Sequence, residues 1–108
     1  PSFDRERAIG PLFELRMYRY PVGAIPKVYE AWAPKIEARM KLAQPVGIWS
    51  SDIGGANQLA HMWAYESFEH RMEARKQFAS IGWPPDSGVS SITMQNMIMF
   101  AADFSPVQ

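Results

Sequence analysis

The residues best suited to chemistry lie together in one short stretch of the sequence, between residues 57 and 75. In its first part, His61, Trp63 and Tyr65 alternate with small or apolar residues, as expected for a β-strand with two unlike faces. These three side chains therefore share one face. Polar groups set in an apolar wall are the usual lining of a small-molecule site, so this face predicts a ligand pocket.

The same residues also have purely structural explanations, and these stay open. Trp63 and Tyr65 could pack an interface between subunits, where aromatic residues are enriched, and His61 could be a neutral histidine with its hydrogen bonds satisfied. Asn57 follows closely after two glycines and suits a turn or the start of a strand better than a catalytic amide. A catalytic function for His61, as a base or a ligand, is kept as an alternative.

The second part of this stretch, residues 68–79, has the spacing of a helix that begins after Ser67, a good N-cap. At about 100° per residue, the predicted buried stripe of this helix contains Arg75, with Arg71 at its edge. The apolar members of the stripe are Phe68, Met72 and Ala79. The other histidine, His70, falls on the exposed side and is predicted to be solvated.

A buried guanidinium needs a partner, because an unpaired charge away from water is costly. Arg75 is therefore expected to meet a carboxylate, and the candidates are Glu14, Glu66 and Asp52. Alternatively, its stem lies over apolar surface while its charged head reaches a cleft. Arg75 and Arg71 could also bind a carboxylate or phosphate group of a ligand.

The composition excludes several classes of function. The chain carries 11 basic and 11 acidic side chains without a long basic run, so neither nucleic acid nor membrane insertion is expected. It has no cysteine, which excludes a disulfide framework and a zinc finger. The histidines lack a suitably spaced carboxylate, and we predict neither a metal site nor a cofactor. The longest apolar run, at 97–102, is far shorter than the roughly 20 residues that span a bilayer.

The chain is expected to form one domain over residues 12–104, with a flexible leader at 1–11 and a tail at 105–108. Local spacing predicts the order β-α-β-β-α-β. The predicted elements are a strand at 13–18, a helix from 25 to before Pro45, strands at 46–50 and 57–65, a helix at 68–79 and a strand at 92–100. Pro34 predicts a kink in the first helix, or two helical pieces. That helix has Met40 on its buried stripe and Arg39 on its polar side.

This order most economically gives an α+β ferredoxin-like sandwich, a four-stranded antiparallel sheet with both helices on one face. In the strand at 57–65, the smaller side chains are expected to face the helices: Ala60, Met62 and Ala64. His61 then lies on the open face of the sheet. A bare face rich in Trp, Met and Tyr needs a cover, and a second copy packed sheet to sheet is the simplest one.

Several short motifs, taken in order, resemble the NIPSNAP family. The matching fragments, from residue 13 to about residue 100, are Glu14-Leu15-Arg16 with Tyr18 and Gly23, Gly47-Ile48-Trp49, Gly54 to Asn57, Trp63 with Tyr65, Arg71 with Arg75, and Trp83. The chain departs from the family pattern at 21–23 and in the proline-rich loop after Trp83. The resemblance implies a homodimeric α+β barrel. It implies little about activity. The absence of cysteine fits a reducing compartment, so the cytoplasm is expected, or the mitochondrial matrix for a eukaryotic family member.

Three hypotheses about function follow. The first is a homodimeric domain of undefined biochemical role that holds a small apolar or weakly acidic ligand, or a protein partner, through the barrel cavity. Its candidate ligand-binding residues are Arg16, Tyr18, Asn57, His61, Trp63, Tyr65, Arg71 and Arg75. The second, by analogy of fold, is a cofactor-independent monooxygenase or a haem-degrading enzyme, classes that share this barrel. The third is a scaffold that binds no ligand.

Overall fold

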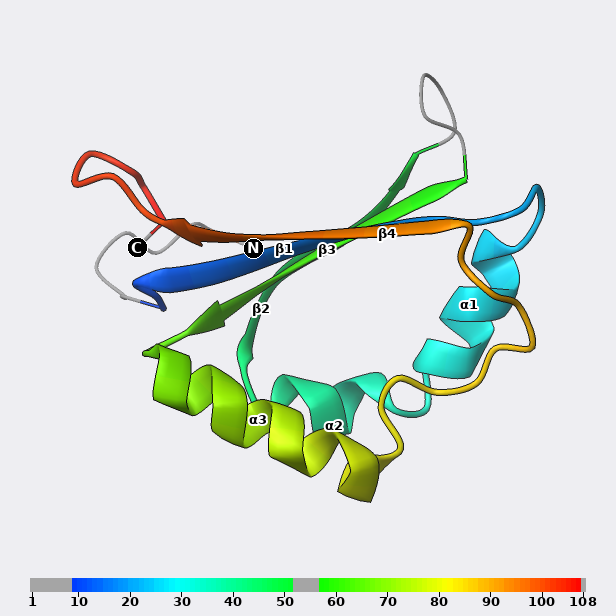
Figure 1. Ribbon diagram of the computed structural model, residues 1–108, viewed down its shortest axis with the longest axis horizontal. Helices are drawn as coiled ribbons and strands as arrows, with labels where there is room; N and C mark the ends of the chain where they lie inside the picture. The colour runs from blue at the N-terminus through cyan, green and yellow to red at the C-terminus, as the bar shows by residue number, and fades with distance from the viewer. Residues whose placement is uncertain (1–8, 52–56, 108) are drawn as a thin grey trace.

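The computed structural model describes residues 9–51 and 57–107, which form a twisted four-stranded sheet with helices on one face (Figure 1). The elements are β1 Leu12–Arg19, α1 Ile25–Trp32, α2 Ile36–Met40, β2 Gln44–Ser51, β3 Gln58–Tyr65, α3 Phe68–Ile81 and β4 Thr93–Phe100. This is the α+β ferredoxin-like order expected from the sequence. None of the helices in the described ranges is long and apolar enough to cross a membrane. Most of the expected leader, and Asp52, lie outside the described residues.

The strands lie in the order β2-β3-β1-β4, and each neighbouring pair runs antiparallel. β1 and β3 therefore form the centre of the sheet. The register places Glu14 of β1 opposite Trp63 of β3, and Arg16 opposite His61. On its other side, Arg16 lies opposite Asn96 of β4. Because directly paired residues share a face, the polar residues of three strands gather side by side.

The helical layer begins with two short helices in place of one. α1 ends at Trp32 and α2 begins at Ile36, so the break falls around Pro34, as the sequence predicts. Proline lacks an N–H and its ring crowds the carbonyl four residues earlier, which prevents a continuous helix. α2 ends at Met40, and the chain enters β2 before Pro45, which is tolerated because β2 is an edge strand.

The helices pack on the face of the sheet opposite to the one predicted. Four side chains of β3 point into the helical layer, each at most 2% exposed: Leu59, His61, Trp63 and Tyr65. The imidazole of His61 lies 5.0 Å from the ring of Trp32 in α1, measured between centroids. By strand alternation, Ala60 and Met62 point to the open face. The prediction is wrong because the space under the short, broken helices is filled by large side chains.

The core consists of two apolar clusters between the sheet and the helices. The first contains Tyr20, Ala24, Ile25, Val28, Trp32, Leu59 and Trp83. The second contains Leu12, Ala43, Trp63, Tyr65 and Ala74. Three polar side chains are buried with them, each at most 2% exposed: Glu14, Arg39 and His61. Buried polar groups require specific partners, so these three mark the place where a site can be sought.

Helix α3 is rotated relative to its predicted orientation. Ser67 caps it as expected, since its hydroxyl oxygen accepts a hydrogen bond from a backbone N–H of the first turn. Ala74 is buried against the sheet. The residues predicted to be buried are exposed instead: Phe68, Met72 and Ala79. Phe68 packs on Phe100 of the edge strand β4, with ring centroids 6.0 Å apart, so the start of the helix contacts the sheet edge.

His70 is half-buried and is not solvated as predicted. The backbone N–H of Glu66 donates to its Nδ1 at 3.0 Å. In a neutral ring, Nε2 then carries the proton and donates to the carbonyl oxygen of Leu42 at 2.9 Å. The imidazole therefore joins the start of α3 to the segment before β2, and both of its nitrogens are used within the fold.

Candidate functional site

A small cavity of about 90 Å³ lies between the sheet and the helices. It is lined by Glu14, Arg16, Tyr18, Trp32, Arg39, His61, Arg75, Phe78, Trp83 and Pro84. These residues come from β1, β3, all three helices and the loop before β4. The lining thus combines aromatic rings with ionisable side chains. Across the described ranges, no group of three or more His, Cys, Asp or Glu side chains is arranged to hold a metal ion.

Glu14 is the centre of an ion network beside this cavity. Its carboxylate accepts two hydrogen bonds from Arg71, from Nε at 3.1 Å and from Nη2 at 2.9 Å. Nη1 of Arg16 donates at 3.1 Å and Nδ2 of Asn96 at 3.2 Å. These bonds use the roughly four acceptor positions that a carboxylate has. One buried side chain therefore ties β1, β4 and α3 together.

These contacts keep Glu14 ionised although it is only 1% exposed. Burial by itself raises the pKa of the carboxyl group, but hydrogen bonds from Arg71 and Asn96 and the charges of Arg71 and Arg16 outweigh it. The pKa of Glu14 falls from 4.5 to about 2. In return, the hydrogen bond to Glu14 raises the pKa of Arg71. The network is therefore fully charged at neutral pH.

His61 is buried, with one ring nitrogen paired and the other unpaired. The indole N–H of Trp63, which can only donate, reaches Nδ1 at 2.7 Å. Nδ1 is therefore the acceptor, and the proton of the neutral ring lies on Nε2. Nε2 is buried and has no hydrogen-bond partner among the described residues. The rings of Tyr18 and Trp32 stand edge-on to the imidazole, at 5.1 and 5.0 Å between centroids.

The imidazole of His61 stays neutral at physiological pH. Burial lowers its pKa, and the positive charges of Arg16 and Arg39 lower it further, to about 3. A neutral ring with its proton on Nε2 can donate a hydrogen bond through that nitrogen and cannot accept a proton there. In this geometry, His61 is therefore a hydrogen-bond donor and does not have the form needed for a general base.

Arg39 of α2 is the least expected residue of the site. It is 2% exposed, and its guanidinium lies over the rings of Trp63 and Phe78, 3.8 and 4.7 Å from their centroids. Nη2 donates to the hydroxyl of Tyr65 at 3.0 Å. Nε and Nη1 are buried and have no partner in the described part of the chain. Burial lowers the pKa of Arg39, but a guanidinium remains protonated in proteins.

Most of the predicted site residues meet at this cavity or directly behind it. Three of the strand residues line it: Arg16, Tyr18 and His61. Trp63 and Tyr65 are not part of its lining, but they contact residues that are. The indole N–H of Trp63 donates a hydrogen bond to His61, and the hydroxyl of Tyr65 accepts one from Arg39. Asn57 lies apart, at the turn before β3, with a φ of 67° that fits the turn explanation.

The two arginines of α3 differ from their predicted positions. Arg71, predicted at the edge of the buried stripe, forms the ion pair with Glu14. Arg75, predicted to lie on the buried stripe, is exposed and forms no ion pair with a carboxylate among the described residues. Its guanidinium lines the cavity, 5.9 Å from the ring centroid of Phe78, as in the alternative in which its charged head reaches a cleft. Glu14, one of the carboxylates predicted to pair with Arg75, pairs with Arg71 instead, because α3 is rotated relative to the prediction.

Arg39 is missing from the predicted site, although the sequence contains a signal for it. It lies three residues after Ile36 and four before Ala43, which is the spacing of the buried stripe. A charged residue is normally assigned to the solvent side, and Met40 takes the buried position in the prediction. In the structure Met40 is 40% exposed and Arg39 is buried.

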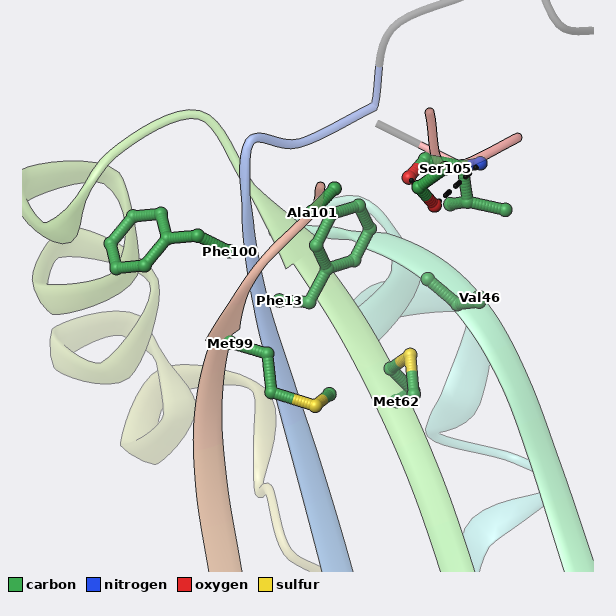
Figure 2. Close-up of a pocket in the computed structure, with 8 residues that line it drawn as sticks. Phe13, Val46, Met62, Met99, Phe100, Ala101 and Ser105 are labelled. Atoms are coloured by element: carbon green, nitrogen blue, oxygen red, sulfur yellow. Dashed lines mark hydrogen bonds between the residues drawn. The ribbon is translucent and has the colours of Figure 1, made fainter. Parts of the chain in front are cut away.

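A second hollow, of about 230 Å³, lies on the open face of the sheet. Figure 2 shows Phe13, Met62 and Met99 around it, with Ser105 from the C-terminal segment near its edge. Val46, Phe100, Ala101 and Val107 complete its lining. The lining is almost entirely apolar, so this face offers packing contacts and not the polar chemistry of the other face.

Comparison with known proteins finds relatives along nearly the whole domain. The NIPSNAP family profile matches residues 13–106. Protein NipSnap homolog 3B of Homo sapiens is 33% identical over 72 residues, which are 66% of this chain and 29% of that protein. Protein NipSnap homolog 1 of Danio rerio is 30% identical over 101 residues, 90% of this chain and 36% of that protein. The chain therefore spans only about a third of the length of these relatives.

Solved structures share the fold. A protein of Agrobacterium tumefaciens is 31% identical with a TM-score of 0.78, over 90% of this chain and 99% of that chain. The heme-degrader MhuD of Mycobacterium tuberculosis, solved with two hemes bound in its active site, is 13% identical with a TM-score of 0.63, over 84% of this chain and 95% of that chain. This second likeness concerns the fold alone. Because the family profile covers nearly all of the domain and agrees with the ordered motifs, the chain belongs to the NIPSNAP family.

Proposed function

We propose that this domain binds a small, hydrogen-bond-accepting molecule in the cavity between the sheet and the helices. The observation that carries the proposal is a set of three buried nitrogens without partners in the described chain, Nε and Nη1 of Arg39 and Nε2 of His61. Buried donors are normally paired, because an unpaired one costs about 1–3 kcal/mol. Both residues line the same cavity, so a ligand there could satisfy them.

The proposed cavity lies on the other side of the sheet from the pocket predicted from the sequence. The predicted pocket lies between the sheets of two subunits, on the open face of the sheet. In the structure, His61 and its neighbours on β3 point toward the helices instead. The predicted residues still support binding, because Arg16, Tyr18 and His61 line the cavity.

The size of the cavity limits the ligand. A volume of about 90 Å³ corresponds to about three water molecules at ~30 Å³ each. Sites for drug-sized ligands measure about 300–1,000 Å³. The ligand is therefore a molecule with few non-hydrogen atoms, unless part of it extends past the exposed Arg75 into solvent.

Thermal unfolding in the presence of small molecules tests this proposal. A ligand at 100 times its Kd adds about 2.7 kcal/mol of stability, which raises the Tm of a domain of this size by on the order of 10 °C. We expect such a rise for the wild type and for Arg19→Met, which changes an exposed arginine at the end of β1. The rise should be much smaller for Arg39→Met. If no member of a broad set of small polar molecules raises the wild-type Tm, the proposal is wrong.

An enzymatic function is the second candidate, and the fold shared with the heme-degrader MhuD is compatible with it. The cavity between the sheet and the helices does not fit haem in the form that the structure shows. The cavity of about 90 Å³ is several-fold smaller than the ~300–1,000 Å³ of sites for drug-sized ligands. In addition, Nε2 of His61 carries the ring proton and offers no lone pair to iron. A cofactor-independent monooxygenase would need a base other than His61.

Titration with haem, followed by absorbance, separates the two candidates. We expect no change in the haem spectrum that depends on His61. A spectral change in the wild type that disappears in His61→Ala, followed by oxygen uptake, would favour the enzyme over the binding domain.

The homodimer belongs to the same proposal, and the open face of the sheet supports it. Trp49 and Met97, which pair with Ala60 and Leu15 on this face, are 50% and 58% exposed. Exposed apolar surface of this kind generally marks an interaction site. In sedimentation experiments we expect Met97→Glu to favour the monomer, whereas Met72→Glu, at a 51% exposed position on α3, should leave the dimer intact. A wild-type monomer at micromolar concentration contradicts this part of the proposal.

A further inference from the structure

The cavity offers hydrogen-bond donors and lacks a carboxylate that is free to accept. Among the residues that the structure describes, Nε and Nη1 of Arg39 and Nε2 of His61 are buried donors without a partner. The carboxylate of Glu14 already accepts four hydrogen bonds, about as many as it can. The hydroxyl of Tyr18 accepts one from Nε of Arg16 at 2.8 Å. A ligand that satisfies these donors must therefore bring its own acceptors.

The charge around the cavity is positive. The guanidiniums of Arg16, Arg39 and Arg75 line it together with the single carboxylate of Glu14, which leaves a formal excess of two positive charges. His61 is neutral and adds none. The chain as a whole has no net charge, so this excess is local. A positively charged cavity lined by apolar rings attracts an anion more strongly than a neutral molecule of the same shape.

We propose that the ligand of this cavity is a small monocarboxylate, whose oxygens accept hydrogen bonds from Arg39 and from Nε2 of His61. This inference rests on the proposed function, because it names the ligand class of the same cavity. A carboxylate has one charge and about four acceptor positions, enough for the three unpaired nitrogens. Trp32 and Trp83, which also line the cavity, suit the short hydrocarbon part of such an acid. A phosphate brings more charge and more oxygens than these donors use.

Calorimetric titration of the wild-type domain with acetate, acetamide and inorganic phosphate tests the ligand class. Acetate and acetamide have nearly the same size, but only acetate is charged. We expect acetate to bind at least about tenfold more tightly than acetamide, because hydrogen bonds to a charged group are the stronger ones. Equal binding of acetamide, or tighter binding of phosphate, overturns the assignment to a carboxylate while the proposed binding function stands. If none of the three binds, the assignment also fails, whereas the proposed function fails only if no small molecule raises the Tm.

The variants Arg39→Met and Arg19→Met locate the binding. We expect the affinity for acetate to fall at least about tenfold in Arg39→Met and to stay unchanged in Arg19→Met. Circular dichroism shows whether each variant is folded. Should Arg39→Met not fold, the Nε–H resonance of Arg39 in the wild type answers the same question, since acetate should shift it and acetamide should not. Unchanged affinity in folded Arg39→Met, or a resonance that acetate leaves in place, overturns the proposal.

Discussion

Replacing Glu14 by glutamine tests the ion network beside the cavity. The carboxylate is 1% exposed and accepts hydrogen bonds from two charged donors, Arg16 and Arg71. Glutamine keeps the size but loses the charge, and its amide nitrogen faces donors without being able to accept from them. Removing one partner of a buried ion pair costs about 3–5 kcal/mol. We expect Glu14→Gln to lower the free energy of unfolding at pH 7 by about that amount.

The pH dependence makes this prediction specific to the charge. Against the effect of burial, the hydrogen bonds from Arg71 and Asn96 lower the pKa of Glu14 from 4.5 to about 2, which corresponds to about 3 kcal/mol. Because the folded state has the lower pKa, this stabilisation is fully present well above pH 4.5 and is lost as the pH falls toward 2. About 2 kcal/mol of it is gone at pH ~3. The difference in free energy of unfolding between the wild type and Glu14→Gln should therefore be smaller at pH ~3 than at pH 7 by about 2 kcal/mol.

Urea unfolding at pH 7, 5, 4 and 3, followed by tryptophan fluorescence at constant ionic strength, measures this difference. Glu30→Gln is the matched control, because Glu30 is exposed on α1. Its free energy of unfolding should stay within about 0.5 kcal/mol of the wild type at every pH. A difference between wild type and Glu14→Gln that is the same at pH 3 as at pH 7 would refute the reasoning about the buried charge.

Three further predictions concern single residues. His61 should not titrate between pH 5 and 8, since burial and nearby arginines hold its pKa near 3. Nitrogen NMR should show the ring proton on Nε2 throughout this range. Protonation of the imidazole near pH ~6.5 would contradict the prediction. Arg39→Met should change the free energy of unfolding by less than about 2 kcal/mol in urea, because it removes a buried charge along with the bond to Tyr65; a loss above ~4 kcal/mol would mean that Arg39 is mainly structural. Ser67→Ala should lower the free energy of unfolding by about 1 kcal/mol, because the N-cap of α3 is lost, and Ser80→Ala near the end of the same helix should have the smaller effect.

The order of the elements could be predicted because its signals are local. The alternation from Phe13 to Tyr18 indicates β1, and Pro34 shows where the first helix breaks. Ser67 marks the start of α3, and Gly82 ends it with a φ of 70°, a conformation that strains most other residues. Each signal belongs to a few consecutive residues, so no knowledge of the tertiary structure is needed to use it.

The orientation of the sheet could not be predicted in the same way. A period of two shows that His61 and Trp63 share a face, but it does not show which layer that face meets. The small residues Ala60 and Ala64 suggest a close approach of the helices on their side. The real arrangement depends on how the layer opposite is filled, and part of that layer is Trp83, which comes from a loop without periodic spacing.

The site could be predicted in part, for a related reason. His61 and Arg16 lie on strands, where their shared face follows from alternation once the strands pair, and they are direct neighbours. Arg39 and Arg71 lie on helices, where an error of one position turns a side chain by about 100°. The position of Arg71 is coupled to its bonds with Glu14, 57 residues away in the sequence. A pair so distant leaves no pattern in a single sequence.

Arg39 connects the stability of the helical layer to the candidate site. α2 has only five residues, too few for a helix to persist by itself in water, so tertiary contacts must hold it in place. The guanidinium of Arg39 supplies such contacts, over the ring of Trp63 and to the hydroxyl of Tyr65. Stability alone does not require this residue, because an apolar side chain in place of a buried charge is often as good or better. The proposed anion site gives Arg39 a second function, because its Nε and Nη1 are buried and have no partner among the described residues.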